Sequence, residues 1–344
     1  MTFTLPDFPP LDPQLAARLR DRIDGKAKPP GSLGRLEDLA VQIGLVQGTE
    51  TPRVERVQAL VFAGDHGLNQ DGVSAYPSAV TAAMVATFLA GRASVNALAQ
   101  ACGVEVRVVD AGVDADLAAH PGLIEAKVRR GTRNAAAEPA MTVGEVDLAL
   151  QRGARIAAEA PADALVIGEM GIGNSASAAL LMCRLAPAPL DECIGAGAGH
   201  DAEGMARKRA VLTRAAARSD AAGPLEVLRQ FGGLEIAMMA GAFLGGAAAG
   251  KLMLVDGFIS TAAALVAVRA GPGLAPRLVF AHASAERGHR TLLAALDARP
   301  LIDLGMRLGE GTGGVLAAPM LRAAARLMSE TASLDDVLSG RLGS

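Results

Sequence analysis

The chain has 344 residues, of which 51% are hydrophobic and 20% are charged, and its formal net charge is -3. These values predict a globular protein with a large core, built as one large domain or two smaller ones. The chain has no Trp, one Tyr and no strongly basic run. Because single-stranded nucleic-acid binders need aromatic platforms and cationic grooves, we expect no nucleic-acid partner.

Cysteine usage and the apolar runs predict the compartment. Cys102, Cys183 and Cys193 form no C-x-x-C pair, so we expect neither a disulfide framework nor a zinc site, and a reducing compartment is favoured. Residues 1–6 lack the layout of a signal peptide. The longest uncharged apolar run, residues 236–250, is shorter than the roughly 18 residues that span a bilayer. We therefore expect a cytoplasmic protein without a membrane span.

In chain order, the first predicted elements are helices. Asp12-Pro13 suits a helix start, because Pro is tolerated in the first turn. The helical pattern of residues 11–49 is interrupted at residues 28–31, which read Lys-Pro-Pro-Gly, and a second helix is predicted from Ser32 through Ile43. Neither segment has the alternation of a strand.

From Val57 onward, short apolar runs alternate with helical segments. The alternation predicts an α/β fold, a parallel sheet with helices on both faces. The predicted strands are residues 58–63, 104–110, 164–168, 251–256 and 277–281, and helices are predicted at about 78–101 and 143–160. Residues 1–50 and 315–344 lie outside the alternation and are predicted to form a small helical domain beside a large α/β domain of residues 51–314.

Reactive side chains follow the predicted strands. Asp65 and His66 come after the first strand, Glu169 after a later one, then Asp256, and finally His282 and Ser284. In open parallel sheets, ligands bind beyond the carboxyl ends of the strands. The sequence therefore predicts a functional site at that edge of the sheet.

The turn at residues 168–175 reads G-E-M-G-I-G-N-S, between a predicted strand and an apolar helix. Strand, glycine turn and helix is the layout that cradles a phosphate. The motif is not a full G-x-G-x-x-G, because Ala176 stands at the last position, and no G-K-[ST] follows. Glu169 would repel a phosphate unless it points toward a sugar or a developing cation. A tight turn without a ligand is the alternative.

Of two other glycine runs, one is a candidate phosphate turn and the other is rejected. Residues 195–201 form a second glycine turn before a helix with Arg207, Lys208 and Arg209, one of which could reach a phosphate; a solvated basic face is the alternative. Residues 245–251 imitate the start of a P-loop, but this run leads from a helix into a strand, which is the reverse of a P-loop.

A third glycine turn, residues 306–314, holds Glu310 among four glycines ahead of an apolar run. The turn is expected to open a helix, whose dipole favours anionic groups nearby; a solvated Glu in a loop is the alternative. With Glu169, it supplies two carboxylates in glycine-rich loops. Such a pair suits an oxocarbenium-like transition state, because one carboxylate takes a proton while negative charge stabilises the sugar cation. Together with a phosphate turn, the pair predicts transfer of a phosphorylated pentose.

The remaining candidates predict no further chemistry. None of the five histidines has a zinc spacing, and each is expected to be a hydrogen-bonded structural residue. Ser284 has no G-x-S-x-G elbow, which argues against a serine hydrolase. The spacing of the cysteines and histidines therefore predicts no zinc site.

The motifs together resemble those of the nicotinate-nucleotide–dimethylbenzimidazole phosphoribosyltransferase family, nearly end to end. Eight of them occur in the family's order. They are K-P-P-G-S-L-G-R-L-E at Lys28, G-D-H-G at Gly64, G-V-S-A-Y-P at Gly72, G-E-M-G-I-G-N at Gly168, G-A-G-x-G-H-D at Gly195, V-D-G-F at Val255, S-A-E-x-G-H at Ser284 and R-L-G-E-G-T-G at Arg307.

The resemblance implies a fold, a reaction and roles for residues. It implies a homodimer with a Rossmann-like domain and no cofactor. Glu310 matches the general base that removes the benzimidazole N–H proton before attack on nicotinate mononucleotide, and Glu169 matches a second active-site carboxylate. The nucleotide phosphate and ribose are assigned to Gly171, Gly173, Asn174, Ser175, Lys208, Asp256, Ser284, Gly309 and Gly311. The base pocket is assigned to Ser74, Tyr76, Met84 and Leu308.

Two departures from the family pattern concern the base. The family often has P-Q-E-V-T-A-Q-M after Tyr76, whereas this chain has P-S-A-V-T-A-A-M, so two side-chain amides are missing. Where the family pattern has G-G-F-D, this chain has Gly232-Gly233-Leu234-Glu235. The preferred base is therefore left open.

Two rival functions share parts of the pattern. A nicotinamide-dependent oxidoreductase needs an acidic residue about 20 positions after its glycine turn, and Glu192 meets that spacing. The broken G-x-G-x-x-G counts against it. A non-catalytic nucleotide-binding regulator would need no carboxylate base, so Glu310 would be dispensable.

Overall fold

The computed structural model describes residues 3–186, 188–197 and 199–341. A six-stranded sheet has the order β3-β2-β1-β4-β5-β6, and every neighbouring pair is parallel. This is the Rossmann order, and the predicted fold class is confirmed. The strands are β1 (Val57–Gly64), β2 (Glu105–Gly112), β3 (Leu123–Glu125), β4 (Ala164–Met170), β5 (Leu252–Val255) and β6 (Leu278–Phe280). The prediction missed β3, since three residues are too few to show a pattern.

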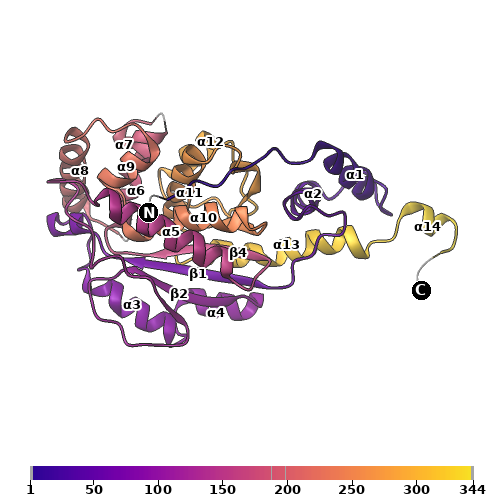
Figure 1. Ribbon diagram of the computed structural model, residues 1–344, viewed down its shortest axis with the longest axis horizontal. Helices are drawn as coiled ribbons and strands as arrows, with labels where there is room; N and C mark the ends of the chain where they lie inside the picture. The colour runs from indigo at the N-terminus through magenta and orange to yellow at the C-terminus, as the bar shows by residue number, and fades with distance from the viewer. Residues whose placement is uncertain (1–2, 187, 198, 342–344) are drawn as a thin grey trace.

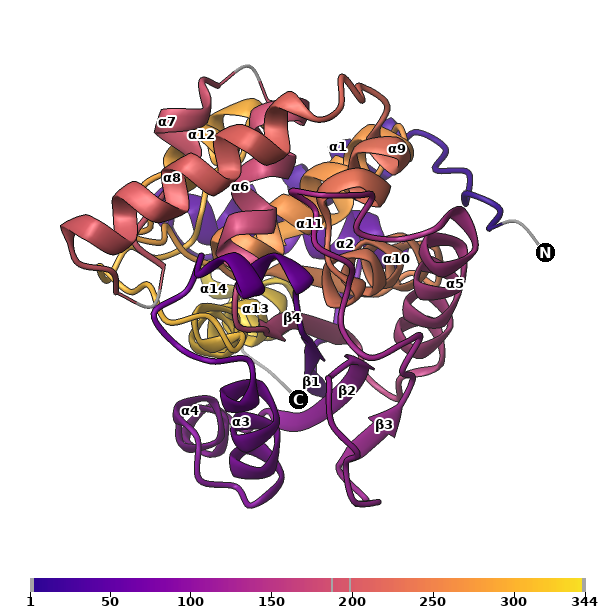
Figure 2. The same ribbon diagram turned by 90° about the vertical axis from the view of Figure 1, so that its left-hand side faces the viewer.

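Helices cover both faces of the sheet. Figures 1 and 2 show α3 and α4 on one face and α5, α10 and α11 on the other. The longer helices are α1 (Pro13–Asp24), α2 (Arg35–Gln47), α3 (Ala79–Leu89), α4 (Ser94–Cys102), α5 (Val143–Glu159), α6 (Asn174–Leu185), α8 (Ala202–Ala217), α9 (Pro224–Phe231), α10 (Leu234–Ala248), α11 (Phe258–Ala270) and α13 (Thr312–Glu330). Shorter ones are α7 (Leu190–Cys193), α12 (His289–Ala295) and α14 (Leu334–Leu338).

Two hydrophobic clusters lie on opposite sides of the sheet. Along β1, Leu60 and Phe62 belong to the cluster shared with α5, α10 and α11, whereas Ala59 and Val61 belong to the one shared with α1, α2, α4 and α13. Every residue of β1 is buried. A strand covered on both faces reads as a continuous apolar run, which is why the sequence located it.

The terminal helices α1 and α2, the end of α13, and α14 lie together at one end of the molecule (Figure 1). α13 packs against α1, α2 and α4, and the Lys26 ammonium donates to the Thr331 carbonyl at 2.7 Å. The division into residues 1–50 with 315–344 and residues 51–314 stays a prediction. α13 begins three residues earlier, at Thr312, and it shares its cluster with the strands.

The helix expected at about residues 78–101 is two helices. α3 ends at Leu89 and α4 begins at Ser94, with Gly91 in a left-handed conformation between them. Within the described residues, the stretch Ala79–Cys102 is the one candidate that is long and apolar enough to cross a membrane by length and composition. The break after Leu89 interrupts that stretch. Most of the apolar run at residues 236–250 lies in the buried helix α10, which ends at Ala248.

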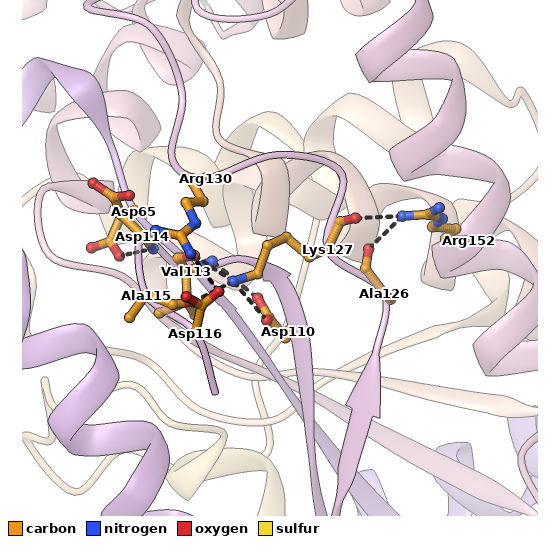
Figure 3. A network of polar contacts seen from close by, with 10 residues as sticks. All are labelled: Asp65, Asp110, Val113, Asp114, Ala115, Asp116, Ala126, Lys127, Arg130 and Arg152. Atoms are coloured by element: carbon orange, nitrogen blue, oxygen red, sulfur yellow. Dashed lines mark hydrogen bonds and ion pairs between the residues drawn. The ribbon is translucent and has the colours of Figure 1, made fainter. Parts of the chain in front are cut away.

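A polar network ties the loop after β2 to the segment after β3 (Figure 3). The Lys127 ammonium lies 3.2 Å from the Asp110 carboxylate and donates to the carbonyls of Val113 and Ala115. Arg152 donates to the Lys127 carbonyl at 2.6 Å. The network braces this edge of the sheet and does not line the cleft described next.

Candidate active site

A cleft of about 470 Å³ opens at the carboxyl ends of the strands. Its walls come from the loops after β1, β4, β5 and β6 and from Arg307–Glu310. The strand order reverses between β1 and β4, and ligands of such sheets bind at this switch point. The predicted edge of the sheet and the cleft therefore coincide.

Glu310 enters the cleft from a strained turn. Its backbone is left-handed (φ 62°) between Gly309 (φ 89°) and Gly311 (φ 86°), which is costly for a residue with a side chain. Gly168 allows this turn to lie against β4, because a Cβ there would be 2.7 Å from the Glu310 carbonyl. The Val95 amide donates to Glu310 Oε2 at 3.2 Å. Burial raises the pKa of Glu310, and the Val95 hydrogen bond opposes that shift.

Glu169 lies beside this turn and is also buried. The Asn174 side-chain amide donates to Glu169 Oε2. Burial raises the pKa of Glu169 to about 8, Asn174 opposes the rise, and the carboxylates of Asp256, Glu235 and Glu310 add to it. The Glu169 carboxyl therefore holds a proton near neutral pH in the absence of a substrate.

Asp256 stabilises the Glu310 turn through backbone hydrogen bonds. It accepts the Gly311 amide at 3.2 Å and the Gly314 amide at 2.9 Å, and so satisfies free N–H groups at the start of α13. Burial raises its pKa to about 7, and these backbone hydrogen bonds oppose the rise. Asp256 lines the cleft, but both of its oxygens are engaged by the protein.

The glycine turn after β4 presents its backbone and the first residues of α6 to the cleft. Lys208 is buried behind this turn and does not line the cleft. Its ammonium donates to Ser175 Oγ at 3.0 Å and to the Gly195 carbonyl at 2.9 Å. Burial lowers the pKa of Lys208 to about 8, against the effect of Glu286. Lys208 thus links the two predicted glycine turns; Ala198 of the second lies outside the described residues.

The four residues predicted for the base pocket all line the same cleft as Glu169. They are Ser74, Tyr76, Met84 and Leu308. Tyr76 is 48% exposed and Leu308 is 56% exposed. The surface that these residues form is therefore open to solvent and largely apolar. The Ser74 hydroxyl accepts the Tyr76 amide at 3.2 Å, which fixes the loop that carries both.

The structure brings most of the predicted site residues to one surface. Those that line the cleft are Ser74, Tyr76, Met84, Glu169, Gly171, Gly173, Asn174, Ser175, Asp256, Ser284, Leu308, Gly309 and Glu310. Lys208 and Gly311 lie behind it. Gly309 is close to Glu169, since a Cβ there would collide with Glu169 Oε1.

The sequence did not single out several lining residues. They are Val80, Gly197, Phe258, Ile259, Ser260, Glu286 and Arg307. Most flank a motif that was recognised, so proximity to the V-D-G-F and S-A-E-x-G-H motifs was the available signal.

His282 departs from the expectation of a structural histidine. His289 contacts Thr261 Oγ1 at 2.9 Å and accepts the Ser284 amide at 2.7 Å. His282 is buried in the cleft wall, yet neither ring nitrogen has a hydrogen-bond partner among the described residues. Its Nε2 lies 3.9 Å from Asp256 Oδ1. Within the described part of the chain, no cluster of His, Cys, Asp and Glu could hold a metal ion.

Comparison with known proteins identifies the family. A family profile described as "Phosphoribosyltransferase" matches residues 8–337. The chain belongs to this phosphoribosyltransferase family.

Curated relatives of the phosphoribosyltransferase are similar over nearly their whole length. One from Ralstonia nicotianae is 55% identical over 333 residues, which cover 95% of this chain and 94% of the relative. One from Cupriavidus taiwanensis is 53% identical over 332 residues, covering 95% and 96%. Both are named nicotinate-nucleotide–dimethylbenzimidazole phosphoribosyltransferase.

Solved structures give the same result. The structure of CobT from Thermus thermophilus has a TM-score of 0.91 and 45% identity, covering 94% of this phosphoribosyltransferase and 98% of that chain. A structure of the enzyme named above, from the same organism, has a TM-score of 0.90 and 44% identity and covers 97% and 100%. These relatives give no support to an oxidoreductase or a regulator.

Proposed function

We propose that this enzyme transfers phosphoribose from nicotinate mononucleotide to 5,6-dimethylbenzimidazole, giving α-ribazole 5′-phosphate and nicotinate for the nucleotide loop of cobalamin. One observation carries the proposal. A buried carboxylate, Glu310, is held in a strained turn on the same cleft as Glu169 and the strand–glycine–helix turn. Relatives of more than 50% identity are named for this reaction.

In the proposed reaction, Glu310 accepts the N–H proton of the base. The freed nitrogen attacks C1′ of the ribose, the bond from C1′ to the pyridine nitrogen breaks, and nicotinate leaves with that electron pair. Attack from the face opposite the leaving group converts the β nucleotide into the α product. Burial suits Glu310 to this task, because its raised pKa makes the carboxylate a stronger base.

Glu169 is proposed to interact with the sugar. Positive charge that develops at C1′ favours the ionised form of a neighbouring carboxyl group. The interaction is therefore stronger in the transition state than in the ground state, which is what catalysis requires. The Asn174 amide keeps the Glu169 carboxyl in place.

The phosphate is assigned to the turn of residues 171–175 and the start of α6. Backbone N–H groups and the helix dipole favour an anion there. The Lys208 ammonium, which contacts this turn through the Ser175 hydroxyl, adds positive charge behind it. We assign the flat base to the apolar side formed by Ser74, Tyr76, Met84 and Leu308.

We also infer a cytoplasmic homodimer. The family resemblance carries both expectations. The three cysteines are free, which suits a reducing compartment. Three small apolar residues of α3 are exposed, Ala79, Ala83 and Ala86. They form an apolar surface that is available for contact with a second copy of the chain. Light scattering during gel filtration tests the dimer, and a mass of about 35 kDa would exclude it.

The reaction is tested by incubating the enzyme with nicotinate mononucleotide and 5,6-dimethylbenzimidazole and separating the products by chromatography. Equal amounts of nicotinate and a new nucleotide support the proposal. Free nicotinate without a new nucleotide would indicate hydrolysis, and no change in either substrate would reject the assignment.

A further inference from the structure

Asp65 and His66 follow β1, yet neither lines the cleft. The His66 side chain is fully buried together with that of Glu235. Its Nδ1 lies 2.9 Å from Ser177 Oγ and its Nε2 lies 2.7 Å from Glu235 Oε1. One imidazole thus joins the loop after β1 to α6 and α10.

The pair is held together by the short hydrogen bond between its two side chains. Burial disfavours the imidazolium form of His66, but Glu235 and Asp65 together favour it, and the net effect is a raised pKa of His66. Glu235 Oε2 has no hydrogen-bond partner among the described residues, and Glu235 Oε1 contacts the His66 ring. Glu235 also lies in the first turn of α10, where the helix dipole favours a negative charge.

The pair lies directly beneath the nucleotide turn, which is residues 171–177. Ser177 belongs to the first turn of α6, next to Asn174 and Ser175. A Cβ at Gly171 would be 3.4 Å from Glu235 Oε1, and one at Gly233 would collide with His66 Cε1. The pair is therefore closely packed on the Gly233 side, and its hydrogen-bonded link to the nucleotide turn is the His66–Ser177 contact.

We propose that His66 and Glu235 form a positioning pair for the nucleotide turn, in which His66 fixes the start of α6 through Ser177 and Glu235 holds the His66 ring in place. The identity of the nucleotide rests on the proposed function. Neither residue touches the cleft, so their effect is transmitted through the turn. The pair also accounts for a G-D-H-G motif that follows β1 without entering the cleft.

The proposal is tested by the affinity for nicotinate mononucleotide, measured by titration calorimetry without the base. The variants are His66→Gln, Glu235→Gln and Ser177→Ala, each checked for folding by circular dichroism. For His66→Gln and Glu235→Gln we expect the Kd to rise about tenfold, the effect of roughly one hydrogen bond. For Ser177→Ala we expect a severalfold rise. The KM for the base should stay within about twofold, which a general loss of structure would not produce.

Asp110→Asn is the matched control (Figure 3). Asp110 is also a buried carboxylate at the end of a strand, and it is paired with Lys127 at 3.2 Å. It does not reach the nucleotide turn, so its loss should lower stability and leave the Kd within about twofold. An equal loss of affinity in Asp110→Asn would overturn the proposal.

Unchanged affinity in folded His66→Gln and Glu235→Gln would also overturn it. If those variants do not fold, Ser177→Ala tests the proposal, because it removes the hydrogen bond to α6 and leaves the His66–Glu235 pair intact. A wild-type Kd in Ser177→Ala would then reject the positioning role. The proposed function is judged separately, by product formation in the wild-type enzyme. The Kd values are measured without the second substrate, so they do not depend on whether the enzyme forms the product.

Discussion

Glu310 adopts a left-handed backbone that a side chain resists, and the structure maintains it with glycines on either side. Glu310→Gln keeps the shape and the turn but cannot accept a proton. We expect kcat to fall by about 10²–10⁴, the usual contribution of a general base. The KM for nicotinate mononucleotide should change little. Steady-state kinetics with both substrates varied will measure this, and a variant that keeps more than about half of kcat would place proton removal elsewhere.

Glu169 predicts a pH dependence of stability. Its pKa is about 8 in the folded protein and about 4.3 when unfolded. Between these values the native state binds a proton that the unfolded state does not, so the free energy of unfolding falls as pH rises across that window. The total change is on the order of a few kcal/mol.

Glu169→Gln, which cannot ionise, should lack that dependence. Urea unfolding at pH 5 and pH 8.5 will compare the two proteins. The variant should gain stability relative to the wild type at the higher pH only, and a difference independent of pH would contradict the raised pKa.

Lys208 predicts a second pH effect, on nucleotide affinity. Its pKa is about 8, so the positive charge is present below that pH and is lost above it. Lys208→Met should raise the KM for nicotinate mononucleotide about tenfold, because it removes the positive charge behind the turn and the hydrogen bond to Ser175, an effect of roughly 1.5 kcal/mol. Wild-type affinity should weaken above pH 8 and that of the variant should not. A variant with the wild-type KM would remove Lys208 from phosphate binding.

At the scale of elements, the start of α13 determines where Glu310 stands. Asp256 accepts two amides of that first turn. Asp256→Asn keeps only one accepting oxygen, so we expect a loss of about 1–3 kcal/mol of stability together with a lower kcat. Thermal unfolding and steady-state kinetics will measure both.

Asp12→Ala is the control for Asp256→Asn. Asp12 caps α1 by accepting the Gln14 amide at 2.8 Å, far along the chain from the site. Its loss should lower stability and leave kcat unchanged. If Asp256→Asn behaves in the same way, Asp256 serves only to cap its helix.

The elements that the sequence located were those with a strong pattern. The strand beginning at Val57 reads as a buried run because both faces are covered, and Glu310 was found because the glycines around it are visible in the sequence. The break between α3 and α4 was missed, since both helices are apolar and no Pro separates them. The placement of Lys208 behind Ser175 was also missed, because a charged side chain in a helix gives no sign of burial.

For the whole molecule, the strand alternation predicted the class of fold, but not which faces the terminal helices cover. The placement of the terminal helices depends on contacts between residues far apart in the sequence. The role of Asp65 and His66 depends on such contacts too, so the sequence left it open. His66 meets Glu235 across 169 residues of sequence, a distance at which no local pattern operates. The function was easier to predict than the long-range contacts, because the proposed catalytic residues lie within short sequence motifs of the family.

The last prediction concerns how the terminal helices and the sheet unfold. Leu321 of α13 is fully buried in the cluster that also holds strand residues such as Val166. Leu321→Ala should cost about 2–5 kcal/mol of stability, the range for a buried leucine. Tyr76, the single tyrosine in a chain without tryptophan, reports on the cleft by fluorescence, while circular dichroism reports on all helices.

Because α13 and the sheet share one cluster, both signals should shift together to lower urea concentrations in Leu321→Ala. Leu338→Ala, at a position that is 78% exposed on α14, should shift neither. A loss seen by circular dichroism with an unchanged Tyr76 transition would show that the terminal helices unfold on their own. In that case residues 1–50 and 315–344 form a separate domain in the energetic sense. Coincident transitions would show that the helices and the sheet form one cooperative unit.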